Sequence, residues 1–246
     1  KEFDKATPLQ QKTALNFSML LDLVASEQPK IRIRFSTSNP QDMSLDVIHT
    51  MAKHKNICKS IHLPIQSGSN NILKKMNRQH TREEYFELID NIKKLIPDCG
   101  ISHDMITGFP TETDQDHQDT LDLMRHIKYD YGFMFAYSER PGTLAARKIK
   151  DNIPEALKKK RLEEIIDLQR EHSNYRTSQF LGKIVTVLIE KASKKSSDFW
   201  SGRTTQNTVV VFPKQNYKVG DFVNVSIENC TSATLIGSAI DYSKDL

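Results

Sequence analysis

The stretch IHLPIQSGS, residues 61–69, has the pattern of a buried β-strand that ends in a polar turn. Ile61, Leu63 and Ile65 alternate with other residues, as the side chains on one face of a strand do. Apolar residues at helical spacing follow, first over 72–76 and then, past a break, over 85–92. Thr81 with Glu84 forms a capping box that begins the second of these helices. The stretch therefore predicts one strand-helix unit, and its flanks repeat the pattern.

Three further segments predict strands of the same sheet: IRIRFSTSNP (31–40), GISHDMITGFP (100–110) and YGFMFAYS (131–138). A helix is expected after the first, and Thr113 with Asp116 forms a capping box that begins a helix after the second. Strands that alternate with helices are typical of a parallel sheet or barrel. We expect an α/β fold made of four strand-helix units of a partial TIM-like barrel, covering residues 1–153.

The chain opens on a predicted helix, with apolar residues at helical spacing over 17–24, rather than on a strand. The predicted strand at 31–37 would then lie at an open edge of the sheet, and long bare edges are usually covered or paired. The expectation is that a preceding N-terminal region belongs to the intact protein.

Composition changes after a charged helix expected within 154–179. Five short β-rich runs follow, at 184–190, 199–204, 208–212, 222–228 and 233–240. Closely spaced strands with polar turns suggest a small OB-like barrel as a second domain, residues 180–246.

Composition excludes some function classes. The 246 residues carry a net charge of +4, which permits an RNA partner without requiring one. The chain contains no run of roughly 18 apolar residues, so a membrane role is not expected. The three cysteines, Cys58, Cys99 and Cys230, are far apart in the sequence and suit neither a disulfide framework nor a zinc site. A cytoplasmic protein is expected.

Polar residues gather where the predicted strands end, which is where α/β barrels build their sites. The cofactor-binding candidates are Gln66, Ser67, Gly68, Asp104, Ser36 and Ser138. Gln66 both donates and accepts hydrogen bonds, and Gly68 would let the backbone approach a ligand. An acid in the apolar strand around Asp104 is costly unless it is paired. The alternatives are a polar turn at 66–68 and a structural pair of Asp104 with Arg or Lys. No residue could be assigned as catalytic, because no nucleophile stands with a histidine in a known pattern.

In the second domain the RNA-binding candidates are Arg203, Thr204, Lys194, Lys195 and Trp200. An aromatic face among cations suits stacked bases and phosphates. The alternative is a hairpin with one core aromatic and a solvated lysine turn.

Several strings together resemble one known family, the radical-SAM methylthiotransferases. They are RFSTSNP (34–40), HLPIQSGS (62–69), MNRQHTREEY (76–85), MITGFPTET (105–113), FAYSERPGT (135–143) and SGRT (201–204). These strings follow the family order and span nearly the whole chain. Two residues depart from the family pattern: Asn39 stands in place of His, and Thr111 in place of Gly.

The resemblance implies that residues up to about 150 form the later part of a radical-SAM barrel, and that the small barrel is a TRAM domain. S-adenosylmethionine (SAM) would lie across the strand ends, near Gln66, Ser67 and Gly68, with Asp104 as a polar contact. Two 4Fe-4S clusters belong to the intact enzyme, and their ligands would lie outside this chain, which alone would be inactive.

The implied activity is transfer of a methylthio group to an isopentenyl-type adenosine beside the tRNA anticodon. The implied partners are the anticodon stem-loop and an electron donor, with the enzyme acting as a monomer. Two alternatives remain open at this stage: methylthiolation of a ribosomal-protein aspartate, and an RNA-binding fragment without catalysis.

Overall fold

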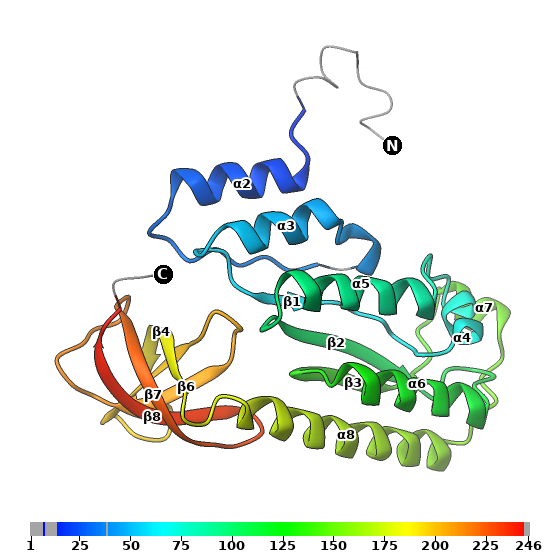
Figure 1. Cartoon of the computed structure of the whole chain (residues 1–246). Coiled ribbons are helices and arrows are strands. Elements are labelled where there is room, and N and C mark those ends of the chain that lie inside the picture. The colour runs from blue at the N-terminus through cyan, green and yellow to red at the C-terminus, as the bar shows by residue number, and fades with distance from the viewer. Residues whose placement is uncertain (1–6, 8–13, 38, 244–246) are drawn as a thin grey trace.

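The computed structural model describes residues 7, 14–37 and 39–243 of the chain. An α/β part packs along one long helix, α8 (Glu155–Ser178), and a small all-β part follows at the carboxyl end of that helix (Figure 1). The helices of the α/β part are α2 (Phe17–Glu27), the 3-10 turn η2 (Pro40–Asp42), α3 (Leu45–Lys53), α4 (Asn70–Lys75), α5 (Arg82–Leu95), α6 (Asp114–Ile127) and α7 (Leu144–Lys148). Its strands are β1 (Ser60–His62), β2 (Gly100–Thr107) and β3 (Tyr131–Ala136).

The three strands form a parallel sheet in the order β1-β2-β3. In the register of β2 and β3, Asp104 lies opposite Phe133 and Ile106 opposite Phe135. One face of the sheet packs on helices, and the other is open: Phe133 and Phe135 remain 54% and 53% exposed. The predicted α/β class is confirmed.

The prediction of a strand at 31–37 was wrong. Its segment makes a single parallel bridge, between Ile33 and Ile57, and the described sheet has three strands instead of four. The predicted alternation is present, since Ile33 and Phe35 pack against the core. The arginines between them bind the small barrel: Arg32 Nη1 donates to the Arg203 carbonyl at 2.6 Å. These contacts anchor the segment on the small barrel.

The strand at 61–65 is shorter than predicted, because the register shifts after Leu63 N donates to the Ser102 carbonyl at 2.8 Å. Pairing resumes beyond it, where Gln66 N donates to the Asp104 carbonyl at 2.9 Å. The predicted helix starts are confirmed, with complete capping boxes at Thr81 and at Thr113.

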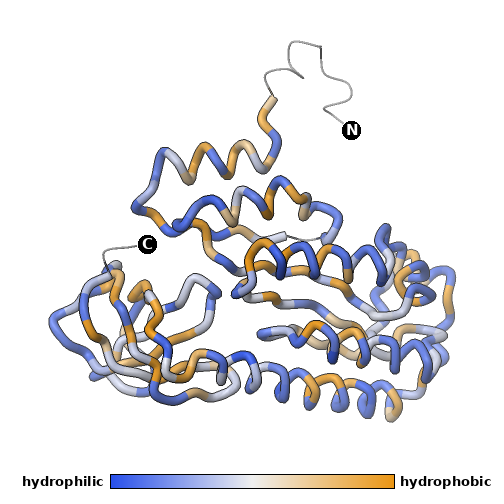
Figure 2. The backbone as a smooth tube through the Cα atoms, in the orientation of Figure 1, coloured by the Kyte–Doolittle hydropathy of each residue, from blue (hydrophilic) through white to orange (hydrophobic). Residues whose placement is uncertain are grey.

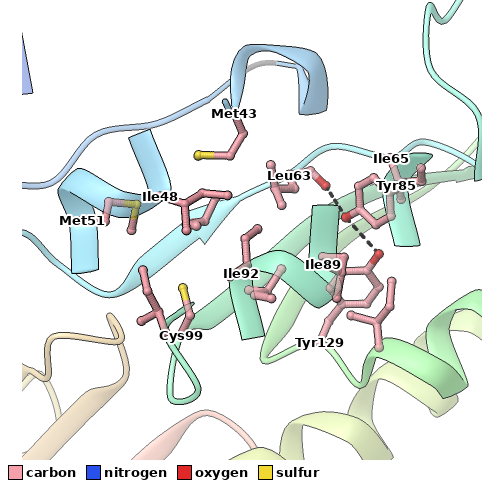
Figure 3. Close-up of a cluster of buried hydrophobic side chains, with 14 of the residues drawn as sticks. Met43, Ile48, Met51, Leu63, Ile65, Tyr85, Ile89, Ile92, Cys99 and Tyr129 are labelled. Carbon is pink, nitrogen blue, oxygen red and sulfur yellow. Dashed lines mark hydrogen bonds between the residues drawn. The ribbon is translucent and has the colours of Figure 1, made fainter. Parts of the chain in front are cut away.

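The core of the α/β part lies between the sheet and its helices. Figure 3 shows Tyr85 of α5 at its centre, where its hydroxyl donates to the Leu63 carbonyl at 3.1 Å and accepts from the Tyr129 hydroxyl at 3.0 Å. These hydrogen bonds satisfy two phenols in an otherwise apolar layer.

Helix α8 (Glu155–Ser178) is largely hydrophilic, with apolar residues recurring along it (Figure 2). Ile165 and Gln169 are buried on the side that meets the sheet. The helix occupies most of the predicted connector, while the exact division into domains at 153 and 179 stays a prediction. Among the described helices, none is both long and apolar enough to cross a membrane.

The small part is a closed barrel with the order β4-β5-β6-β8-β7, as predicted. Its strands are β4 (Ile184–Ala192), β5 (Phe199–Arg203), β6 (Val209–Pro213), β7 (Phe222–Cys230) and β8 (Thr234–Tyr242). Val187, Val210, Phe212 and Val223 are fully buried at its centre. The barrel lies beside the amino ends of β2 and β3 (Figure 1), where Asn207 Nδ2 donates to the Tyr131 hydroxyl at 3.3 Å.

Candidate functional site at the open face of the sheet

The turn after β1 is fixed by helix α6. Gln66 has a φ of 74°, and its backbone bonds β2 on both sides, accepting from Ile106 N at 2.9 Å. Gly68 N donates to Thr120 Oγ1 at 2.9 Å, and a Cβ on Gly68 would lie 2.5 Å from the Asp119 carbonyl oxygen. Gly68 is therefore needed for close packing on α6. Our expectation that it leaves room for a ligand has no support in these contacts, and the SAM contacts predicted for Gln66, Ser67 and Gly68 stay predictions.

Asp104 lies on the open face of β2 and pairs with a histidine of β1. Its Oδ1 is 3.3 Å from His62 Nε2, and the other ring nitrogen of His62 is 2.9 Å from Ser102 Oγ. The ring of Phe133 meets the His62 imidazole edge-on, with centroids 6.1 Å apart. The free-energy cost of placing the Asp104 carboxylate in an apolar strand is thus offset by a histidine, rather than by the Arg or Lys that we considered.

Arg78 joins this group, and sequence analysis missed it as a site residue. It lies between α4 and α5, half-buried, and near enough to Asp104 for the carboxylate to act on its charge. Burial lowers the pKa of the Arg78 guanidinium, and Asp104 opposes that effect. In the described part of the chain no acceptor hydrogen-bonds this guanidinium. It is an available cation at the carboxyl edge of the sheet.

The loop beyond β2 is held by a buried ion pair. The carboxylate of Glu112 accepts from Gly108 N at 2.8 Å and from Arg161 Nη1 at 3.0 Å. Burial raises the pKa of the Glu112 carboxyl, and Arg161 of α8 counters this most strongly. Helix α8 therefore fixes the shape of the loop at this strand end.

Thr111, in the same loop, has a φ of 71°, a left-handed conformation that glycine adopts more easily. Its backbone N–H donates to Asn152 Oδ1 at 2.8 Å, and its hydroxyl accepts from Lys75 Nζ at 2.5 Å. These bonds offset the strain of placing a β-branched residue where the family pattern has glycine.

The other cofactor-binding candidates of the α/β part, Ser36 and Ser138, are less well placed. Both are exposed, so their predicted role in cofactor binding stays a prediction. His103 points away from the open face and is 2.9 Å from Gln169 Oε1 of α8. Burial lowers the pKa of His103 to about 4, which indicates a neutral core residue.

The three cysteines lie on different elements. Cys58 and Cys99 are buried in the α/β part, and Cys230 is half-buried at the end of β7. Burial raises the pKa of the Cys99 thiol to about 12, which disfavours the thiolate that iron requires. These three thiols do not fit an iron-sulfur cluster.

The small barrel separates the predicted RNA-binding residues. Lys194 and Lys195 lie in the turn between β4 and β5, whereas Arg203 and Thr204 lie at the far end of β5. Arg203 Nη1 donates to the Asn207 carbonyl at 2.8 Å, and its Nε is 3.4 Å from Glu190 Oε2.

Two of these residues have structural partners. Thr204 is buried and closes the β5–β6 turn, accepting from Thr208 N at 3.3 Å. The ring of Trp200 is covered by Lys214, with the ammonium 4.3 Å from the ring centroid. Contact of all five candidates with RNA stays a prediction.

Comparisons with known proteins agree with this architecture. The family model described as the radical SAM superfamily matches residues 7–124, and that of the TRAM domain matches residues 178–240. Proteins named tRNA-2-methylthio-N(6)-dimethylallyladenosine synthase from Christiangramia forsetii and Flavobacterium psychrophilum are 67% and 59% identical, each over 99% of this chain. The chain covers 50% and 51% of those two relatives, about half of their length.

A solved structure supports the fold. The coproporphyrinogen III oxidase HemN of Escherichia coli, described as a radical SAM enzyme, superposes with a TM-score of 0.51 at 16% identity. The match covers 81% of this chain and 53% of that one. The two domains follow the order of the matching strings, and the two relatives are more than half identical to this chain over almost its whole length. This chain therefore belongs to the radical-SAM methylthiotransferase family.

Proposed function

We propose that the protein containing this chain adds a methylthio group to an isopentenyl-type adenosine beside the anticodon of tRNA. The observation that carries the proposal is the 67% identity to a tRNA-2-methylthio-N(6)-dimethylallyladenosine synthase over 99% of the chain. The fold supports it, because an open sheet face stands next to a small barrel of a type that binds nucleic acid.

Residues at the carboxyl edge fit SAM. Its methionine end carries a carboxylate and an ammonium group, and its ribose carries hydroxyls. Arg78 offers a guanidinium without a hydrogen-bonded partner in the described structure, and Asp104 a carboxylate beside it. Bound SAM and the reduced clusters would supply the radical and sulfur chemistry. The role of Arg78, Asp104 and Gln66 would be to hold and orient SAM.

In this proposal the cluster ligands lie in the part of the relatives' length that this chain does not span, since Cys58, Cys99 and Cys230 lie on different elements. The proposal includes two 4Fe-4S clusters in the intact enzyme, an electron donor, a cytoplasmic location and a monomeric state. A base in the anticodon loop is already unpaired, so bringing it to a deep site costs little.

The test is disruption of the gene that encodes this chain, followed by mass spectrometry of nucleosides from total tRNA. We expect the 2-methylthio-modified adenosine to disappear and its unthiolated precursor to accumulate. Complementation with the intact gene must restore the modified nucleoside. Unchanged tRNA with loss of a methylthio group from a ribosomal-protein aspartate would replace the proposal with the alternative activity.

A further inference from the structure

The aromatic residues of β3 form a ladder on the open face of the sheet. Tyr131, Phe133 and Phe135 alternate with residues that face the helices, and they are 36%, 54% and 53% exposed. The rings of Tyr131 and Phe133 meet edge-on, with centroids 6.1 Å apart. Gly132 between them faces the helices, where its Cα lies against the ring of His103. The ladder is therefore fixed by the strand register.

A cavity of about 460 Å³ lies where this ladder reaches the small barrel. Its lining includes Tyr131 and Phe133 from the sheet, Arg34 from the preceding segment, and Glu190 and Arg203 from the barrel. Asn207, also in the lining, fixes the position of Tyr131 through the hydrogen bond to its hydroxyl. Both parts of the molecule thus contribute to one groove.

The charges of this groove suit a phosphate. Glu190 lies between two arginines, 3.9 Å from Arg34 Nη2 and 3.4 Å from Arg203 Nε. One carboxylate cannot neutralise two guanidinium groups, so this cluster keeps one positive charge in excess. The side chain of Arg34 is 39% exposed and can turn toward a ligand.

The polar groups beside the ladder argue against an apolar occupant. Asp104 and His62 lie next to Phe133 on the same face, and an apolar segment packed on them would bury a carboxylate and an imidazole at considerable cost. A nucleobase suits both features, because it stacks on an aromatic ring and hydrogen-bonds at its edges.

We propose that the groove between β3 and the small barrel binds the unpaired target nucleotide of the RNA, with its base stacked on Phe133 and its phosphate held by Arg34. The nucleotide enters from the amino ends of the strands, opposite the edge where SAM is proposed to lie. This inference rests on the proposed function and adds the residues that hold the substrate.

The experiment uses the full-length gene product and an anticodon stem-loop RNA with 2-aminopurine at the adenosine beside the anticodon. Fluorescence anisotropy gives the dissociation constant, and 2-aminopurine emission reports stacking of that base. Base stacking on an aromatic ring is worth about 1–3 kcal/mol, so Phe133→Leu should weaken binding roughly 5- to 150-fold and abolish the quenching. Phe133→Trp should keep both.

Two further variants separate the parts of the proposal. Tyr242→Leu removes an aromatic ring of similar exposure, 53%, at the end of β8 outside the groove, and should leave the affinity unchanged. Arg34→Gln should lower the slope of log affinity against log salt by about 0.7 to 1, as loss of one phosphate contact predicts.

Equal losses for Phe133→Leu and Tyr242→Leu, or no loss for either, would overturn the groove as the base site. An acidic peptide that binds in place of RNA and depends on Phe133 would overturn the choice of occupant. If Phe133→Leu binds RNA normally while gene disruption still removes the modified nucleoside, the groove fails and the proposed function stands. If Phe133→Leu abolishes stacking but gene disruption leaves the cellular tRNA unchanged, the groove stands and the proposed function is refuted.

Discussion

Replacing Arg161 by methionine should destabilise the loop at the end of β2 through a buried charge. Arg161 and Glu112 have side chains that are each only 4% exposed, with Nη1 and Oε1 3.0 Å apart. Methionine retains much of the side-chain volume and removes the guanidinium. The Glu112 carboxylate then stays buried with no full counter-charge in contact, held by the backbone donors of Gly108 and Phe109 and the Thr107 hydroxyl, with His117 Nδ1 3.9 Å away. Breaking a buried pair in this way costs about 3–5 kcal/mol.

The pH dependence of that cost follows from the pKa of Glu112. Burial already raises this pKa, and Arg161 is the strongest opposing influence, so Arg161→Met raises it further. The folded variant then binds a proton at a pH where the unfolded chain does not, and stability must fall as pH rises through the unfolded and then the folded pKa. Lowering the pH should recover about 1.4 kcal/mol per unit below the raised pKa, until the unfolded carboxyl also protonates.

Urea denaturation followed by circular dichroism, at about pH 8 and about pH 5.5, measures both effects. The control is Arg170→Met on the same helix, where the pair with Asp167 is 63% and 71% exposed. Loss of that pair should cost less than about 1 kcal/mol at either pH. Adding Glu112→Gln to Arg161→Met should restore most of the lost stability. The reasoning is refuted if Arg161→Met costs no more than Arg170→Met, or if its cost grows at the lower pH.

Four other changes test separate contacts. Arg78→Leu should weaken SAM binding to the full-length protein at least tenfold by calorimetry, since a charge-assisted bond is worth about 1.5–3 kcal/mol. Arg78→Lys should restore part of the affinity, and an affinity of Arg78→Leu equal to that of the unchanged protein would remove Arg78 from the site. Gly132→Ala places a Cβ 2.2 Å from His103 Nε2 and should lower the melting temperature, with an overpacking cost of about 1–3 kcal/mol. Because the pKa of His103 is lowered to about 4, the free energy of unfolding should fall as pH drops from 6.5 toward 4, and His103→Gln should remove that part of the pH dependence. Tyr85→Phe removes the donor to the Leu63 carbonyl and should cost about 1–2 kcal/mol in urea denaturation, whereas a neutral result would show that this carbonyl is satisfied otherwise.

Sequence patterns predicted the elements whose structure depends on neighbours along the chain. The capping boxes at Thr81 and Thr113 need only residues three positions apart, and both are present. The five strands of the small barrel were predicted from alternation and turns. Alternation at 31–37 predicted a strand wrongly, and it could not show the contacts of Arg32 and Arg34, which reach residues more than 150 positions away.

The candidate site was only partly predictable for the same reason. Asp104 could be singled out because an acid in an apolar strand needs a partner, but alternation could not reveal that the partner is His62. Arg78 lies between two helices, where a basic residue is usually solvated, and only the fold brings it near Asp104. Gly68 was chosen as a site residue, yet the nearest atoms to a Cβ there belong to α6.

The register of β2 and β3 places Asp104 and Phe133 in the middle of the sheet, between the proposed cofactor edge and the proposed RNA groove. Phe133 lies opposite Asp104, so a base stacked on Phe133 lies next to the carboxylate proposed to contact SAM. Tyr131 and Phe135 lie four residues apart on β3, about 13 Å at the usual rise of a strand, with Phe133 midway between them. Since α8 packs along β3 and runs into the small barrel, it fixes the distance from that barrel to Phe133. Under the proposed function, this fixed distance lets an RNA held by the small barrel present its base at Phe133, next to the Asp104 carboxylate.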